Sequence, residues 1–263
     1  MNKIKTIGLA LSGAFILAGP LLWAQAGPKP KSQKELQALQ AWQAATDPDA
    51  RIKAIENVLT NFADTEFKVP LLQDAMFIEQ RKGDFAQVVF YGERVLEADP
   101  KNALALVTLA GETARHTREF DLDKEEKLAK VDKYAKDAVE AAKTMPKPRA
   151  DIADAQWENV RKDVQAQAYE AMGMAASLRK KYDDSIADYK QALSLEATPD
   201  PATMVRMSQA YEDAGKFDEA NDALDKALAT PNLNPTVKAV AENKKAEVAK
   251  KKAAGAAKPP GAQ

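Results

Sequence analysis

The sequence predicts an all-α protein built as a stack of antiparallel helix pairs, and three observations carry this prediction. Residues 32–252 show helical periodicity that recurs between breaks, without strand-like alternation. The breaks contain proline or glycine. Alanine, lysine, glutamate, leucine and glutamine dominate the 263 residues, and aromatic residues make up 6%, a mixture that favours helices over strands. We expect about five helix pairs followed by a C-terminal capping helix.

Residues 1–26 predict an export signal. Lys3 and Lys5 precede an uncharged apolar run, which ends in the small-x-small cleavage pattern Ala24-Gln25-Ala26. Cleavage after Ala26 predicts a periplasmic or secreted protein with no stable membrane insertion. An uncleaved inner-membrane anchor is the alternative, because the run is close to spanning length. Residues 27–31 form a short proline-containing linker to the helical region 32–252.

Residues 201–231 show most clearly which side-chain sizes recur. Small and aromatic residues alternate along the first helix, glycine marks the turn, alanines follow in the second helix, and proline ends the unit. The residues concerned are Ser208, Tyr211, Gly215, Phe217, Ala220, Ala227 and Pro231. Residues 167–197 repeat the arrangement, with Gly173 at the small site and Tyr182 and Tyr189 as aromatics. Leu193 and Leu228, which occupy matching positions, lie 35 residues apart.

This pattern resembles the tetratricopeptide repeat family, whose signature runs W-x2-L-G-x2-Y, then A-x3-F, then P. The resemblance implies helix–turn–helix units of 34 residues that stack into a solenoid. Two features depart from the signature. The tryptophan site holds Leu72, Leu106, Tyr169 and Met204, and glycine occupies the small site once, at Gly173.

Three less regular units precede these two. Residues 71–102 keep the turn glycine Gly83 and end in Asp99-Pro100, and residues 35–62 form a degenerate first pair. The unit that starts at Ala103 contains about nine inserted residues near Thr117–Glu125, which form either a binding loop or a spacer. Residues 150–165 are additional and should extend the following helix by several turns. Residues 235–252 predict the capping helix, and residues 253–263 a disordered low-complexity tail.

Composition and motifs argue against several kinds of chemistry. The net charge of −1 is too balanced to predict nucleic-acid binding, and the absence of cysteine excludes disulfides and thiolate metal sites. The single histidine, His116, is interpreted as a helix-terminal residue, because one histidine cannot supply a typical zinc site. Asp121, Asp123, Glu125 and Asp132 have EF-hand-like spacing, but the position that needs glycine is glutamate, so an acidic first helical turn is the preferred interpretation. We therefore expect no catalytic residue, metal or cofactor.

The tryptophans and the charge runs receive structural interpretations. Trp42 and Trp157 have helically spaced apolar neighbours, which predicts packing in the core. The charge runs KKYDDS and KKAEVAKKK are interpreted as solvated faces.

The family resemblance implies a non-catalytic adaptor or scaffold that binds a peptide or helix of another protein in the groove lined by the first helix of each pair. Carrying the family's groove positions onto this sequence gives Gln73, Phe77, Gln80, Val107, Met174, Ser177, Val205 and Gln209. The groove is either open or covered by the protein's own residues. With the export signal, the prediction is an adaptor of the bacterial cell envelope. The alternatives are an anchored form, and an enzyme or solute-binding protein built on a helical repeat.

Overall fold

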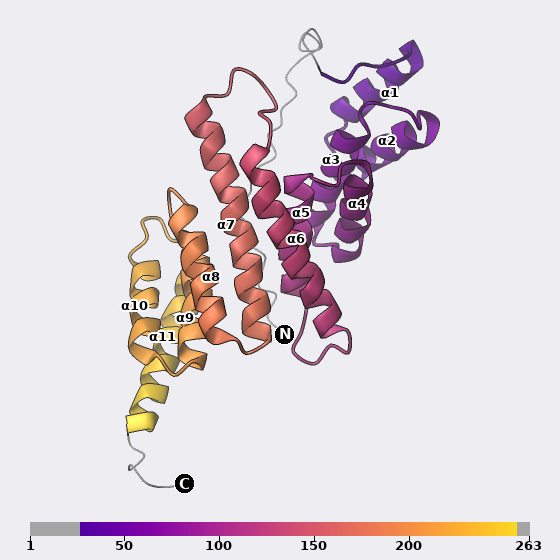
Figure 1. Ribbon diagram of the computed structural model, residues 1–263. Helices are drawn as coiled ribbons and strands as arrows, with labels where there is room; N and C mark the ends of the chain where they lie inside the picture. The colour runs from indigo at the N-terminus through magenta and orange to yellow at the C-terminus, as the bar shows by residue number, and fades with distance from the viewer. Residues whose placement is uncertain (1–26, 257–263) are drawn as a thin grey trace. The chain divides into compact units, whose positions relative to one another are not determined.

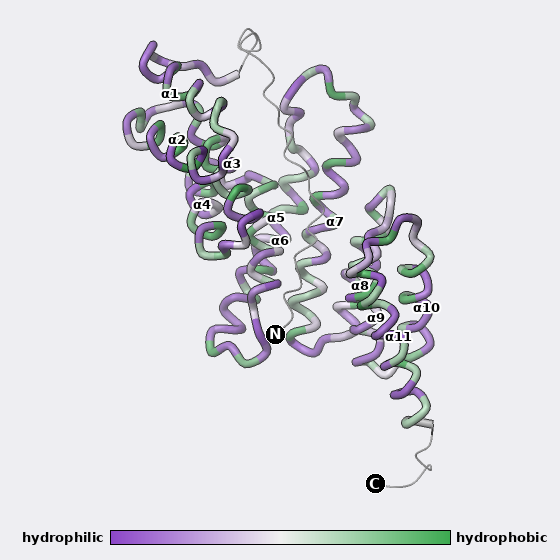
Figure 2. Tube along the Cα trace, turned by 180° about the vertical axis from the view of Figure 1, so that it is seen from behind, coloured by the Kyte–Doolittle hydropathy of each residue, from purple (hydrophilic) through white to green (hydrophobic). Residues whose placement is uncertain are grey.

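The computed structural model describes residues 27–256, and these residues form eleven α-helices with no strand among them (Figure 1). The described chain divides into two units, residues 27–100 and residues 101–256. Consecutive helices pack as antiparallel pairs within each unit, as the sequence predicts. Hydrophilic and hydrophobic residues alternate along the helices (Figure 2), because each helix turns one face toward its neighbours. None of the helices in residues 27–256 is long and apolar enough to span a bilayer, and the predicted signal lies outside the described residues.

The first unit contains two helix pairs. They are α1 (Gln33–Ala44) with α2 (Pro48–Asn61), and α3 (Lys68–Lys82) with α4 (Phe85–Ala98). Trp42 of α1 is buried, as predicted, and its indole N–H donates to Asp74 of α3 at 2.7 Å. Arg51 of α2 reaches the same carboxylate oxygen at 2.5 Å, so one acidic side chain of α3 joins both preceding helices.

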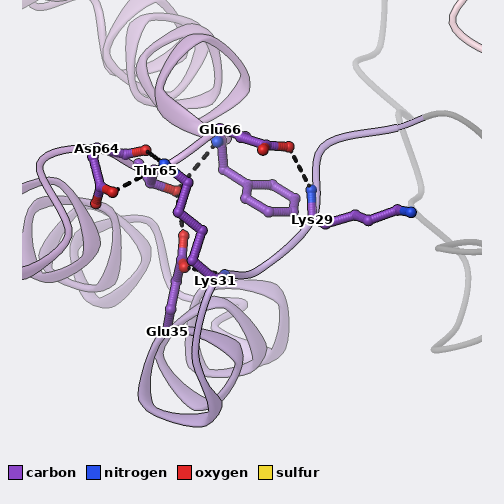
Figure 3. Close-up of polar contacts among 7 residues, drawn as sticks. Lys29, Lys31, Glu35, Asp64, Thr65 and Glu66 are labelled. Carbon is purple, nitrogen blue, oxygen red and sulfur yellow. Dashed lines mark hydrogen bonds and ion pairs between the residues drawn. The ribbon is translucent and has the colours of Figure 1, made fainter.

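The linker before α1 is fixed to the loop between α2 and α3 (Figure 3). The Lys29 backbone N–H donates to Glu66 at 2.9 Å, and the Lys31 ammonium pairs with Asp64 at 2.9 Å. Between them lies Glu35, which is 1% exposed and accepts a hydrogen bond from the Thr65 hydroxyl at 2.6 Å. A buried carboxylate needs such donors. These contacts therefore set where the chain enters the first helix pair.

The second unit contains three helix pairs and a final helix. They are α5 (Ala103–His116) with α6 (Lys124–Thr144), α7 (Asp154–Leu178) with α8 (Tyr182–Leu195), α9 (Pro201–Asp213) with α10 (Phe217–Leu228), and α11 (Pro235–Ala256). The sequence prediction of five pairs and a capping helix is confirmed. The helix α11 continues to Ala256, four residues beyond the predicted end of the capping helix at 252, and residues 257–263 lie outside the described residues.

The predicted extension of the fourth pair is confirmed in α7, which has 25 residues. Its additional first turns are fixed to the end of α6 through the carbonyl of Met145. The indole N–H of Trp157, which is buried as predicted, donates to this carbonyl at 2.9 Å, and the Arg161 guanidinium donates at 2.8 and 3.1 Å. Three donors thus satisfy a carbonyl that follows the end of a helix.

Three pairs share one turn geometry between their helices. Gly83 and Gly215, the predicted turn glycines, have φ angles of 75° and 74°, and the corresponding Lys180 has φ 61°. In each case the residue that follows donates its N–H to a carbonyl five positions earlier, which closes a Schellman-type end. An L side chain is unfavourable in this conformation, so Lys180 occupies a position that suits glycine.

Gly173 occupies the closest approach between α7 and α8. A Cβ atom built on it would lie 2.8 Å from the ring of Tyr189, which is 2% exposed. The Ser185 hydroxyl donates to the Gly173 carbonyl at 2.8 Å across the same crossing. The small site of the fourth pair is therefore glycine because an aromatic ring fills the space of a side chain.

Candidate partner-binding site

The predicted groove residues divide into two sets, because the chain divides into two units. In the first unit, Gln73, Phe77 and Gln80 follow one another at intervals of four and three residues along α3, which places them on one face of the helix. All three are half-buried. They form a row of one aromatic residue between two amides.

Val107, on α5, lies in the second unit and is 4% exposed. Nearly all of α5 is buried, and it packs against both α6 and α7. Val107 therefore presents little surface to a partner. The apolar composition of residues 103–114 contains the signal for this burial, since an all-round apolar helix is a core helix rather than a surface one.

The other four predicted residues lie on neighbouring helices, Met174 and Ser177 on α7 and Val205 and Gln209 on α9. All four are half-buried. Met174 and Val205 pack against one core cluster, which includes buried residues of α8, α9, α10 and α11. The structure therefore brings two apolar side chains from two first helices to the edge of a single core.

An ion pair joins α7 and α9 beside these residues. The Arg206 guanidinium lies 2.7 Å from the Glu170 carboxylate, whose side chain is 16% exposed. Glu170 lies four residues before Met174 on the same face of α7, whereas periodicity gave no reason to single out Arg206. A partly buried pair with close geometry fixes the spacing of the two helices.

The polar members of this set already have partners within the unit. The Ser177 hydroxyl lies 2.6 Å from that of Ser185, and the Gln209 amide donates to Asp213 at 2.9 Å. Ser177 also borders a hollow of about 310 Å³, lined by Glu119, Ser177, Leu178, Lys180, Tyr182 and Asp213. A second hollow, of about 500 Å³, shares Lys180 and Tyr182 with the first. Both hollows are shallow surface features near the turns between helices.

Carboxyl groups with raised pKa values lie at the opposite end of α8. Burial raises the pKa of Glu196 to about 7, and the nearby carboxylates of Asp200, Glu170 and Asp163 act in the same direction. The backbone N–H of Asp200, which donates to Glu196 at 2.7 Å, lowers it in part. Burial also raises the pKa of Asp163. Sequence reasoning missed this cluster, because Asp163 and Glu170 lie on α7, whereas Glu196 and Asp200 lie in the connection between α8 and α9.

The residues weighed for chemistry have structural partners instead. His116 ends α5, as predicted, with Nδ1 2.9 Å from the Glu112 carbonyl. Asp121 pairs with Lys127 at 3.0 Å, and Arg179 reaches both Glu125 and Asp132 at 3.0 Å. No group of three or more histidine, aspartate or glutamate side chains in residues 27–256 is arranged to hold a metal ion.

Comparisons with known proteins identify the repeat. Residues 166–199, which include the second half of α7 and all of α8, match the tetratricopeptide repeat (TPR) family. The fold is similar to that of a thermophilic TPR protein from Thermus thermophilus, at 18% identity over 80% of this chain and 95% of that chain, with a TM-score of 0.53. Residues 166–199 therefore match one TPR unit, within a fold similar to that of a TPR protein.

A second solved structure, that of MamA, shares the fold at 18% identity over 76% of this chain and 92% of that chain, with a TM-score of 0.51. No curated protein matches the chain. TPR proteins generally mediate protein–protein interactions, and proteins of this fold are typically non-catalytic.

Proposed function

We propose that this protein is a non-catalytic adaptor or scaffold that binds an amphipathic helix or an extended segment of a partner protein along α7 and α9. The observation that carries the proposal is the pair of half-buried apolar side chains, Met174 and Val205, at the edge of one core on neighbouring helices. A partner that covers them would complete a burial that the folded chain leaves partial.

The surroundings of this pair favour a protein ligand over a small molecule. Ser177 and Gln209 lie on the same two helices, and the Glu170–Arg206 ion pair holds those helices together. An apolar strip with polar residues beside it is the arrangement that helix-in-groove recognition uses. The neighbouring hollows of about 310 and 500 Å³ are shallow and lined by charged side chains, whereas small-molecule sites are enclosed and mostly apolar.

The proposed place of action is the bacterial cell envelope. This part rests on residues 1–26, whose basic start, apolar run and Ala24-Gln25-Ala26 motif have the pattern of a cleaved export signal. Fractionation with and without inhibition of signal peptidase tests it. Cleavage produces a shortened periplasmic form that the inhibitor abolishes, whereas an anchored protein stays full-length in the membrane fraction under both conditions.

Site-specific photo-crosslinking in the source cells tests the binding face. A photoreactive residue at Gln209 is expected to capture one defined partner, and Met174→Glu in the same chain is expected to reduce that capture at least tenfold, because it places a charge in the apolar strip. Ala187→Glu on α8 is the matched control, since it introduces the same charge at an exposed position.

Thermal unfolding checks that both variants fold. If Met174→Glu does not fold, Gln209→Lys replaces it, and the photoreactive residue is then placed at Ser177. Equal capture by Met174→Glu and Ala187→Glu chains would place recognition elsewhere on the molecule.

A further inference from the structure

The last helix, α11, packs against α9 and α10. Its contact residues repeat every seven positions. Among its described side chains, Ala241 and Val248 are the two that are buried, both at 0% exposure. Residues seven apart lie on the same face of an α-helix. The apolar contact of α11 is therefore a narrow strip of two small side chains.

A first pair of lysines, also seven residues apart, reaches a single buried carboxylate. Lys244 and Lys251 lie 3.4 and 2.5 Å from the two oxygens of Glu212 on α9. The Glu212 side chain is 0% exposed, and these lysines are its ion-pair partners in the described residues. Removing a carboxylate from water is strongly unfavourable unless cations compensate it. Seating a helix over Glu212 therefore requires positive charge at these positions.

A second pair of lysines lies along the rim of the same contact. Lys245 pairs with Asp225, and Lys252 pairs with Asp218, both on α10. These four side chains are between 43% and 77% exposed, so salt screens their attraction. These two exposed ion pairs help to orient α11, whereas the buried Glu212 favours a helix that carries positive charge.

The apolar strip and the lysines combine into one sequence pattern. Each small buried residue of α11 is followed by lysines three and four positions later, at 244 and 245 after Ala241 and at 251 and 252 after Val248. The helix α10, by contrast, is anchored by Leu224 together with three buried alanines. The docking of α11 thus relies on charge more than the docking of its neighbour does.

We propose that the face of α9 and α10 that carries Glu212, Asp218 and Asp225 is a receptor for a lysine-rich amphipathic helix of a partner protein, and that α11 is an occupant of this receptor built into the chain. The partner helix carries small residues seven apart, each followed by lysine or arginine at positions +3 and +4. This proposal does not depend on the groove along α7 and α9, because it uses none of the eight predicted groove residues.

Charge complementarity argues for this class of partner. A helix without the cations would leave Glu212 buried and uncompensated, and a helix with large residues at the small positions would overlap α9 and α10. The partner must also displace α11, whose tether of residues 229–234 keeps it at a high effective concentration. A partner that matches both the apolar strip and the lysines is therefore selected over a generally basic helix.

Binding of a labelled synthetic peptide, residues 233–256, to the full chain tests the receptor. The Lys244→Ala/Lys251→Ala chain is expected to release its own α11, seen as faster amide exchange over residues 235–252. We expect it to bind the peptide at least tenfold more tightly than the wild-type chain does. Adding Glu212→Gln is expected to weaken that binding at least tenfold. The matched control is Lys238→Ala/Lys250→Ala, which removes two exposed lysines from the same helix and should behave as the wild type.

If the double variant does not fold, Ala241→Phe releases α11 by steric overlap and replaces it in the same measurements. The proposal is overturned if a folded chain that has released α11 does not bind the peptide, or if Glu212→Gln leaves the binding unchanged. A wild-type dimer that the unlabelled peptide converts to monomer would also overturn it, because the occupant would then be α11 of a second copy.

Discussion

The fourth and fifth helix pairs have equivalent positions 35 residues apart, yet they fill their crossings differently. In the fourth pair, Gly173 leaves room for the ring of Tyr189. In the fifth pair, the corresponding residues are Ser208 and Leu224, both fully buried. Ser208 is larger than Gly173, and Leu224 is smaller than Tyr189. The two crossings therefore have similar summed side-chain volumes although their residue types differ.

The polar contacts of the two pairs differ as well. In the fourth pair, Ser177 and Ser185 share a hydrogen bond between α7 and α8. The corresponding residues of the fifth pair are Glu212 and Ala220, and Glu212 pairs with lysines of α11 instead. Equivalent positions therefore join the two helices of the fourth pair to each other, but in the fifth pair they attach the following helix, α11.

The volume argument predicts the largest effect. Tyr189→Leu should destabilise the protein by about 2–3 kcal/mol, because it leaves a cavity beside Gly173. Gly173→Ser should cost about 1–3 kcal/mol, because the new side chain meets the ring. The double variant has the residues of the fifth pair at this crossing. Its loss of unfolding free energy should be smaller than the sum of the two single losses by at least about 1 kcal/mol. Urea unfolding measures the cycle, and strict additivity would contradict the argument.

Substitutions at the turns should change stability by less, and in opposite directions in the two pairs. Gly215→Ala should destabilise by about 1–2 kcal/mol, since the φ of 74° disfavours an L side chain. Lys180→Gly should stabilise by up to about 1 kcal/mol, reduced by loss of the ion pair with Glu119. Thermal unfolding of both variants tests the contrast, and the same sign for both changes would refute it.

The serine bridge predicts an effect confined to the fourth pair. Ser185→Ala should cost about 1 kcal/mol, because it removes the donor to the Gly173 carbonyl and the contact with Ser177. Ser208→Ala is the matched change in the fifth pair, where the hydroxyl donates to the Val205 carbonyl of its own helix. We expect it to cost less than half as much in the same unfolding measurement. Equal costs would show that the bridge does not join the two helices.

The end of α8 predicts the smallest effect, a dependence on pH. The pKa of Glu196 in the folded protein, about 7, exceeds its ordinary value of 4.5. The folded state therefore binds this proton more tightly, so stability falls as pH rises from 4.5 to 7. Glu196→Gln should remove this part of the pH dependence and stabilise the protein at about pH 8, by on the order of 1 kcal/mol after allowance for partial exposure. Pro231 occupies the corresponding position of the fifth pair, which lacks this titration. Parallel stability–pH curves for the variant and the wild type would contradict the assignment.

Much of the fold could be predicted because it depends on local signals. Gly83 and Gly215 mark their turns, and the additional residues 150–165 reappear largely as extra turns of α7. Lys180 could not be predicted to adopt the same left-handed conformation, because the surrounding helices, rather than the residue, impose it.

The candidate site was less predictable, because position within a repeat does not determine exposure. Val107 and Met174 occupy groove positions of the family pattern, but the first is buried and the second half-buried. The interpretation of the run at 244–252 as a solvated face was wrong for Lys244, whose side chain is 20% exposed and reaches a buried carboxylate. Lys251 pairs with the same carboxylate but is exposed, as predicted. Such ion pairs join residues of different helices, and the hydrophobic periodicity of neither helix indicates them.

The contacts of Lys29 and Lys31 with the loop after α2 define a tether length. Only Gly27 and Pro28 separate the predicted cleavage position, Ala26, from the first anchored residue. Three extended residue steps span about 10 Å at most. If the apolar segment is retained, this short connection holds the first helix pair against the bilayer surface. If it is removed, the new α-amino group emerges within the same distance of Glu66, and the protein is free to diffuse.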